Sequence, residues 1–158
     1  MDITEQWTSV KTNNGSVIYR YEYEKNGITY HVDGRHVILK PSVREIHIAN
    51  VLAVRYGKTV EVIPRVNFPQ GIKTPDYIID GATYDLKTII TNVEEAFYNS
   101  ISKKKNQATN FILDISTNSF SEDEILTRVL KVYTSTHTKF VEKMVIIKDD
   151  RVIKAYSR

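Results

Sequence analysis

Apolar and polar positions alternate in short segments over the first forty residues, which is the pattern of β-strands exposed on one side. In the segment Val17 to Tyr23, every second residue is apolar or aromatic: Val17, Tyr19, Tyr21 and Tyr23. Three pairs of residues that favour tight turns separate such segments: Asn14-Gly15, Asn26-Gly27 and Asp33-Gly34. We therefore predict a β-meander over residues 1–40. Its tyrosine face either packs against the core or stacks nucleobases, and packing is the favoured interpretation.

After Pro41 the apolar spacing changes to the period of a helix. Ser42 followed by Glu45 predicts a capping box, and Gly57 predicts the end of the helix. We therefore place the first helix at Val43 to Tyr56.

The rest of the chain continues to alternate between strands and helices. The predicted elements are a strand over Val60 to Arg65, two strands joined at Asp80-Gly81, a helix from Asn92 through Ile101 into a lysine cluster, a strand over Asn110 to Ile115, a helix capped by Ser121 and Glu124, and a hairpin that joins Met144–Lys148 to Val152–Tyr156. This order predicts the α/β class, with a mixed sheet of the α+β kind. We expect the meander at residues 1–40 to pack on a core at residues 41–158.

Composition limits the classes of protein to which the chain can belong. With 158 residues, of which 41% are hydrophobic, the chain is long enough for one buried core and short for two. It contains no cysteine, which excludes disulfides and thiolate metal sites, so a metal would need oxygen or imidazole ligands. The longest apolar runs are too short to cross a bilayer, so we expect no membrane partner.

The net charge of +3 is too small to indicate a nucleic-acid partner by itself, so the distribution of the cations matters more. Lys103, Lys104 and Lys105 form the densest basic cluster. No two of the histidines have the spacing of a metal-binding pair on a helix, and we interpret them as structural or exposed. They are His31, His36, His47 and His137.

The segment from Thr74 to Lys87 carries the residues that suggest chemistry. A two-residue turn at Asp80-Gly81 would pair the two strands so that Asp76 lies directly opposite Asp85. Lys87 lies on the same face because side chains alternate along a strand. We therefore predict that two carboxylates and one ammonium group converge.

Two carboxylates opposed across a strand pair repel each other, so they require a compensating positive charge. A divalent cation, Mg²⁺ or Mn²⁺, would supply it, bound by Asp76, Asp85 and the backbone carbonyl of Leu86. Lys87 would then orient or deprotonate the attacking water in phosphodiester hydrolysis. The alternative is that Asp85 and Lys87 are solvent-facing hairpin residues joined in a surface ion pair.

Pro75-Asp76 followed by Asp85-Leu86-Lys87 resembles the signature of the PD-(D/E)XK nuclease superfamily, on the second and third core strands. The similarity extends over Gly34–Gly57, Pro64–Asn67, Thr74–Lys87 and Lys105–Ala108. Together these segments are similar to the tRNA-nuclease domains at the C-termini of contact-dependent inhibition toxins, and related domains occur in phage and mobile-element proteins. The resemblance implies a restriction-endonuclease-like core.

For the site, the resemblance implies that Asp76 and Asp85 bind the metal and that Lys87 is the catalytic lysine. It also implies that Glu45 assists the metal or its water. Glu45 has a second explanation, because it is the third helical residue of the capping box that Ser42 opens.

The resemblance further places Lys105 and Gln107, with Lys104 beside them, near the scissile phosphate as substrate-binding residues. These lysines also have a second explanation, because a basic last turn complements the helix dipole. The chain departs from the family pattern at Asn106, where a basic residue is frequent.

The resulting hypothesis is a metal-dependent endonuclease that cleaves tRNA as a toxin domain and is neutralised by a cognate immunity protein. The choice of tRNA comes from the resemblance, whereas the hairpin register indicates only phosphodiester hydrolysis. Two alternatives stay open: a DNA nuclease of a phage or mobile element, and a non-catalytic module that binds nucleic acid or protein. The expected site of action is the cytoplasm of the producing or a target bacterial cell, reached as part of a larger secreted protein.

Overall fold

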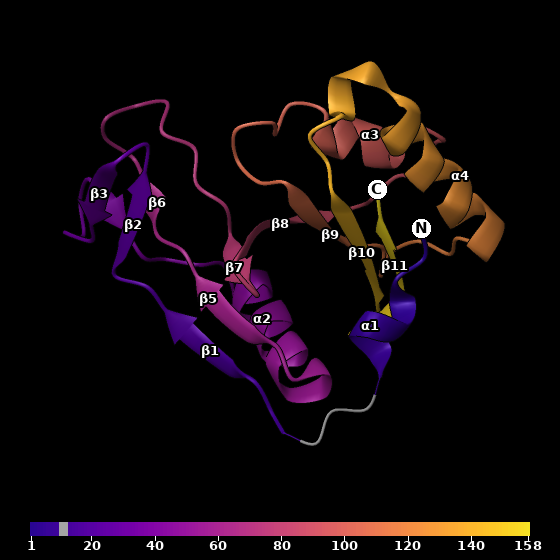
Figure 1. Ribbon diagram of the computed structural model, residues 1–158, viewed down its shortest axis with the longest axis horizontal. Coiled ribbons are helices and arrows are strands. Elements are labelled where there is room, and N and C mark those ends of the chain that lie inside the picture. Colours follow the sequence, from indigo (N-terminus) through magenta and orange to yellow (C-terminus); the bar gives the residue numbers. More distant parts are fainter. Residues whose placement is uncertain (10–12) are drawn as a thin grey trace. The chain divides into compact units, whose positions relative to one another are not determined.

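A mixed sheet of seven strands runs through the computed structural model, which describes residues 1–9 and 13–158 (Figure 1). Its strand order is β1 (Ser16–Tyr19), β5 (Thr59–Val62), β7 (Tyr77–Ile79), β8 (Ala82–Thr88), β9 (Asn110–Asp114), β10 (Lys143–Lys148) and β11 (Arg151–Ser157). Two small sheets pair β2 (Glu22–Lys25) with β3 (Ile28–His31) and β4 (Val37–Ile38) with β6 (Arg65–Val66). The helices are α1 (Thr4–Thr8), α2 (Val43–Tyr56), α3 (Ala96–Ile101), α4 (Glu122–Thr134) and the 3₁₀ turn η1 (Thr136–Thr138). The predicted mixed α/β class is confirmed.

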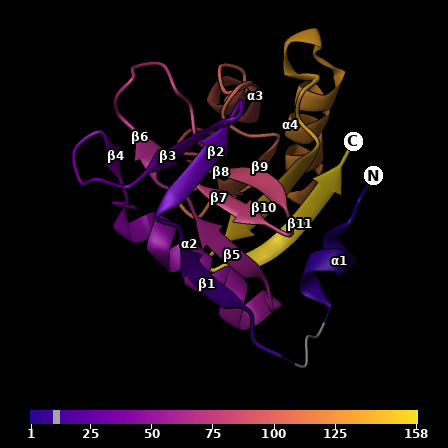
Figure 2. The same ribbon diagram turned by 60° about the vertical axis from the view of Figure 1, so that its left-hand side comes forward.

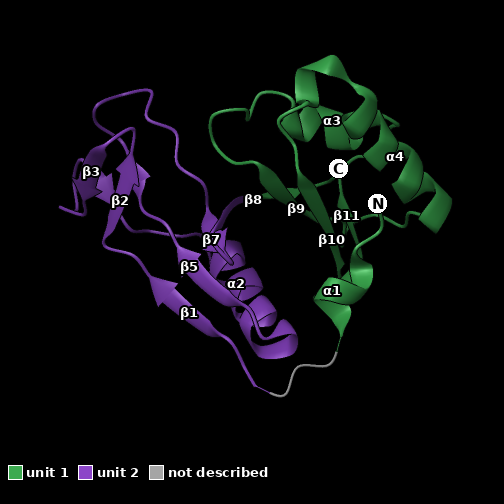
Figure 3. Cartoon of the chain, in the orientation of Figure 1, with its two compact units in different colours: residues 1–9, 85–158 green, residues 10–84 purple. Residues whose placement is uncertain are grey.

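The chain divides into two compact units (Figure 3). Unit 1 consists of Met1–Ser9 and Asp85–Arg158, and unit 2 extends from residue 10 to Tyr84. Strand β8 begins in unit 2 and ends in unit 1. The boundary predicted at residue 40 stays a prediction. No helix in the described ranges, 1–9 and 13–158, has the length and apolar content needed to cross a membrane.

In unit 2, α2 packs against β1 and β5. Its bounds are those predicted from Ser42 and Gly57, and Gly57 adopts the left-handed conformation that ends the helix (φ 63°). The parallel pairing of β1 with β5 depends on Gly15, because a Cβ atom there would lie 1.8 Å from the carbonyl oxygen of Lys58. Glycine is therefore required at this close approach of two backbones.

The predicted meander is only partly right. The hairpin of β2 and β3 forms at Asn26-Gly27, where both residues have positive φ. The predicted strand from Val17 to Tyr23, however, is split. β1 ends at Tyr19, the Arg20 amide still donates to the Val62 carbonyl of β5 (3.0 Å), and β2 begins at Glu22. β1 is thus a parallel partner of a distant strand instead of a meander strand.

Two of the three tyrosines on that face do not pack into the core, whereas Tyr23 is half-buried. Tyr19 and Tyr21 are 40% and 68% exposed, and Val17 is half-buried. The favoured packing interpretation is therefore wrong for these two tyrosines, because the split at Arg20 removes the single flat strand on which it depended.

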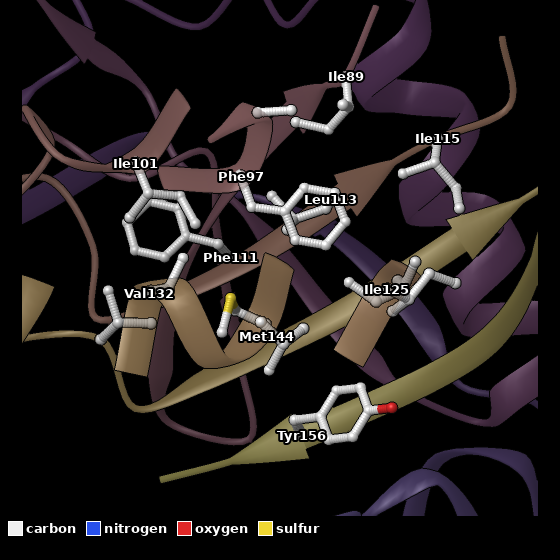
Figure 4. Close-up of a cluster of buried hydrophobic side chains, with 14 of the residues drawn as sticks. Ile89, Phe97, Ile101, Phe111, Leu113, Ile115, Ile125, Val132, Met144 and Tyr156 are labelled. Carbon is white, nitrogen blue, oxygen red and sulfur yellow. The ribbon is translucent and has the colours of Figure 1, made fainter. Parts of the chain in front are cut away.

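In unit 1, helices α3 and α4 cover one face of β9 and β10, as Figures 2 and 4 show. The covered face consists of alternate residues of the two strands, as expected for a sheet. The cluster includes Phe97, Phe111, Leu113, Val129, Met144 and Ile146, all nearly without exposed surface. The predicted strand from Asn110, the capped helix after Ser121 and the final hairpin at Asp149-Asp150 are confirmed.

Helix α1 was assigned to the meander, and this assignment is wrong. Ile3 and Trp7 are each 4% exposed, and α1 packs beside β11. The Ile3 amide donates to the Ala155 carbonyl (2.8 Å), so the first residues add to the edge of β11. The signal in the sequence is the four-residue spacing of the two apolar side chains, which is the spacing of a helix face.

Two further bounds differ from prediction. The strand predicted over Val60 to Arg65 stops at Val62 and resumes as β6, because Pro64 has no amide hydrogen to donate to a ladder. Helix α3 ends at Ile101, so the lysine cluster lies in turns beyond it. Asn92 does not cap α3, and its carbonyl instead accepts a hydrogen bond from Arg128 of α4.

Candidate active site

The hairpin of β7 and β8 has the register predicted from its turn. Asp80 and Gly81 have φ of 52° and 78°, and the paired residues are Tyr77 with Tyr84, Ile78 with Thr83, and Ile79 with Ala82. The register ends at Tyr77, one residue after Asp76. The pairing of Asp76 with Asp85 therefore stays a prediction.

Asp85 and Lys87 form an ion pair on unit 1. Lys87 Nζ lies 2.6 Å from Asp85 Oδ2, and the exposed fractions of the two side chains are 20% and 1%. The two residues share a face of β8 because they are two apart. Since Asp85 is fully buried, the alternative of a solvent-facing surface ion pair is wrong for this residue. Removing a carboxylate from water is costly unless partners compensate it.

The second partner of Asp85 is Gln107, whose Nε2 donates to Asp85 Oδ1 at 3.3 Å. Gln107 is held by the turns that follow α3, where its amide donates to the Lys104 carbonyl (3.0 Å) and the Lys104 amide donates to the Ile101 carbonyl (2.9 Å). Ala108, which follows, is 3% exposed and anchors the end of the turn in the core. The structure thus brings Gln107 to the predicted catalytic carboxylate.

The lysines of the same turns face water to different degrees. Lys105 is exposed and Lys104 is half-buried. Neither lies in a helical last turn, because α3 ends at Ile101. The helix-dipole explanation of these lysines is therefore wrong, and their role in substrate binding stays a prediction.

Glu45 lies in the first turn of α2 in unit 2. The Ser42 hydroxyl accepts a hydrogen bond from the Glu45 amide (3.1 Å), as predicted. The Glu45 carboxylate does not complete the capping box; it accepts a hydrogen bond from Arg65 Nη2 at 2.8 Å. The Glu45 side chain is 12% exposed and that of Arg65 is 58% exposed, so the pair presents a guanidinium to solvent.

Arg65 is a candidate that sequence reasoning missed. It lies in the segment Pro64–Asn67 that resembles the nuclease family, but nothing local indicates its partner. The contact arises because β6 pairs with β4, which directly precedes α2. Asp76, also in unit 2, is half-buried, and its carbonyl accepts a hydrogen bond from the Ile63 amide (3.1 Å).

The fit of a divalent cation can be judged from the donor atoms. Asp85 Oδ2 is buried and, apart from its ion pair with Lys87, meets no donor at hydrogen-bonding angles in the described part of the chain. In the same part, no three residues among histidine, cysteine, aspartate and glutamate form a group that could hold a metal. A carboxylate oxygen and the carbonyl of Leu86 are hard ligands that fit Mg²⁺ or Mn²⁺, and a second carboxylate would have to join them.

Two comparisons with known proteins find a match for this chain. The family described as the contact-dependent growth inhibition CdiA C-terminal domain matches residues 73–152, and this range includes Asp76, Asp85, Lys87 and Gln107. No curated protein matches the chain. One solved chain, from a structure described as the CdiA-CT/CdiI toxin and immunity complex from Burkholderia pseudomallei, is similar with a TM-score of 0.59 and 23% identity, over 91% of this chain and 100% of that chain. That likeness shows a shared fold. Because the family match spans half of the sequence, this chain belongs to the CdiA C-terminal toxin domain family of contact-dependent growth inhibition.

Proposed function

We propose that this chain is a metal-dependent endonuclease of the PD-(D/E)XK type that hydrolyses phosphodiester bonds, with tRNA as its substrate. The observation that carries the proposal is the buried Asp85 carboxylate between the Lys87 ammonium and the Gln107 amide. A fully buried carboxylate that holds a lysine on the same strand face is costly for stability and suits charge-dependent catalysis.

Each group has a chemical role in the proposal. Asp85 and the Leu86 carbonyl would hold Mg²⁺ or Mn²⁺, and Asp76 would be the second carboxylate if the hairpin register continues by one residue. The metal, when bound, would lower the pKa of a water molecule and polarise the phosphate. Lys87 would orient that water and offset the charge that develops on the phosphate oxygens.

The neighbouring groups would position the substrate. Gln107 has two amide hydrogens, so it can donate one to Asp85 and the other to a phosphate oxygen. Lys104 and Lys105 would attract the neighbouring phosphates. In unit 2, Glu45 would assist the metal or its water, and Arg65 would hold the Glu45 carboxylate in one orientation.

The biological setting follows from the family. We infer that the domain acts in the cytoplasm of a target bacterial cell after delivery as part of a larger secreted protein. Since the similar solved structure is described as a toxin and immunity complex, we also infer a cognate immunity protein for this chain. The net charge of +3 is compatible with either an RNA or an acidic protein partner.

The experiment that tests the proposal is cleavage of total tRNA and of plasmid DNA by purified protein with Mg²⁺ or Mn²⁺. We expect tRNA cleavage that stops with a chelator and with Asp85→Ala. Asp123→Ala is the matched control, because Asp123 is an exposed carboxylate of α4 and should leave cleavage unchanged. Cleavage of DNA alone would show that the substrate is DNA and not tRNA. Cleavage of neither polymer would contradict the proposal.

Metal binding is tested separately by thermal shift. A cation that binds the folded protein raises its melting temperature, whereas a cation that does not bind leaves it unchanged. We expect Mg²⁺ or Mn²⁺ to stabilise the wild type and Asp123→Ala, and to have no effect on Asp85→Ala. An equal shift in all three proteins would place the metal elsewhere.

A further inference from the structure

The loop between β6 and β7 in unit 2 exposes an aromatic ring. Phe68 is 62% exposed, although a phenylalanine is normally buried. The loop that carries it runs directly into Pro75-Asp76 of the proposed active site. A single exposed apolar side chain is common on protein surfaces, so a role for Phe68 depends on what holds and surrounds its ring.

The ring is held in place by its neighbours. The amides of Asn67 and Phe68 donate to the His36 carbonyl at 2.7 and 3.2 Å. The Phe68 ring lies against the His36 imidazole, with centroids 5.5 Å apart and planes tilted by 52°. Phe68 is therefore an exposed side chain on a fixed backbone with one side supported.

The imidazole is itself fixed by Asp33. Asp33 Oδ2 lies 2.8 Å from His36 Nδ1, and Asp33 Oδ1 accepts hydrogen bonds from the amides of Arg35, His36 and Val37. Backbone donors from Val37 and Arg35 and the His36 ring hold the pKa of the Asp33 carboxyl well below its usual range. The carboxylate thus stays charged and orients the ring at all physiological pH values.

Positive charge gathers on the same segments. Arg35 is exposed next to His36, and Lys73 is exposed in the loop of Phe68. Lys25, at the tip of the hairpin of β2 and β3, donates to the Lys73 carbonyl. Burial, and after it the charge of Lys73, lower the pKa of Lys25. An aromatic ring on segments that also carry cations is a combination that binds unpaired nucleotides.

Two carboxylates of the hairpin of β2 and β3 line a cavity that neither Phe68 nor Lys73 lines. Glu22 lies 3.3 Å from the His31 imidazole, and Glu24 pairs across the hairpin with Thr29. Glu22 and Glu24 line this cavity of about 250 Å³ with Arg20 and Glu61.

We propose that Phe68, supported by His36, is a stacking platform for an unpaired base of an RNA substrate, with Arg35, Lys25 and Lys73 of the neighbouring segments as its cationic partners. The inference rests on the proposed nuclease function and adds a substrate-binding element to it. Sequence-specific recognition of RNA mainly uses unstacked bases in loops and ends, which stack on aromatic side chains or on guanidinium planes. With a base stacked on Phe68, the three cations would bind the phosphates on either side of that nucleotide.

The test measures binding without cleavage, in the Asp85→Asn background. The probes are fluorescein-labelled tRNA, a single-stranded RNA, a fully paired RNA duplex and a single-stranded DNA, each followed by anisotropy. We expect Phe68→Ala to weaken binding of tRNA and single-stranded RNA by about tenfold and to leave the duplex unchanged. Phe68→Trp should bind within a factor of about two of the parent, because it keeps a stacking surface.

A second readout and a control separate stacking from a change in fold. In Phe68→Trp, bound RNA should quench the new fluorescence, and Trp7 can be replaced by phenylalanine to remove the other signal. Val54→Ala is the control, because Val54 of α2 is also an apolar side chain in unit 2 and 62% exposed. It should bind every probe as the parent does.

The outcomes distinguish this inference from the proposed function. If the parent binds RNA and Phe68→Ala binds it equally well, the platform is refuted and the nuclease function stands. An equal loss for single-stranded DNA would refute the assignment to RNA. If the parent binds neither nucleic acid, the platform and the proposed function both fail.

Discussion

Replacing Lys87 with methionine isolates the buried charge on Asp85. Methionine keeps the length and the apolar stem of lysine. It leaves the Asp85 carboxylate, whose side chain is 1% exposed, with the Gln107 amide as its remaining partner among the residues that the structure describes. Removing one member of a buried ion pair costs about 3–5 kcal/mol, because the other charge is left uncompensated. The Gln107 hydrogen bond is present with and without Lys87, so it does not change this difference. We therefore expect Lys87→Met to lower the free energy of unfolding by about 3–5 kcal/mol.

The double variant Asp85→Asn with Lys87→Met tests whether the cost of removing Lys87 comes from the charge on Asp85. Asp85→Asn removes the charge but keeps an acceptor for Gln107, so Lys87→Met should cost much less in that background. Urea unfolding of the parent, both single variants and the double variant, followed by far-UV circular dichroism, measures the coupling. A cost of Lys87→Met below about 1 kcal/mol, or the same cost in both backgrounds, would refute the claim that Asp85 is buried and charged beside Lys87.

Three further predictions concern the scaffold. Ser121→Ala should lower the free energy of unfolding, measured in urea, by about 1 kcal/mol, because it removes the cap of α4. The Ser121 amide is the main cause of the lowered pKa of Glu124, so Glu124 should stabilise the fold above its ordinary pKa and lose this contribution as the pH falls. A pH series in which the wild type shows no such loss would contradict the capping box. Gly15→Ala should destabilise by about 3 kcal/mol or more, because the new Cβ meets a backbone carbonyl that cannot move freely; an unchanged unfolding midpoint would count against the pairing of β1 with β5. Trp7→Ala should lower the free energy of unfolding by about 3–5 kcal/mol, because it removes the side chain that packs α1 beside β11. The tryptophan fluorescence of the wild type should be blue-shifted and move to the red on unfolding, and red-shifted emission from the native protein would contradict the burial of Trp7.

Turn and cap chemistry explains which elements could be predicted from sequence. The pairs at Asn26, Asp80 and Asp149 place residues with positive φ in two-residue turns, and a hairpin register follows from such a turn without further information. In the same way, the side chains of Ser42 and Ser121 define the starts of α2 and α4 within one residue. Turns and caps depend on residues that are close in the sequence, so they can be predicted from short segments.

Long-range pairing explains what could not be predicted. Two parallel pairs, β1 with β5 and β9 with β10, are joined by segments that contain other elements. The alternation of apolar and polar residues predicts a strand but not the strand with which it pairs. The same limit applies to the site. Asp85 and Lys87 are two residues apart and their shared face could be predicted, whereas the Arg65 contact with Glu45 depends on the pairing of β6 with β4.

The burial of Asp85 favours a functional explanation over a structural one. An apolar pair of similar volume in place of a buried ion pair is commonly neutral or stabilising, so stability alone gives no reason to keep a carboxylate at a position without exposed surface. The flanking residues of the hairpin follow the local rules for a strand, and Tyr84 beside Asp85 is 3% exposed as a core residue should be. Departures from otherwise consistent local rules are expected where a protein does chemistry. The departure at Asp85 coincides with the ammonium of Lys87 and the amide of Gln107, which is why these three residues, ahead of the exposed lysines, are the ones on which the proposed catalysis depends.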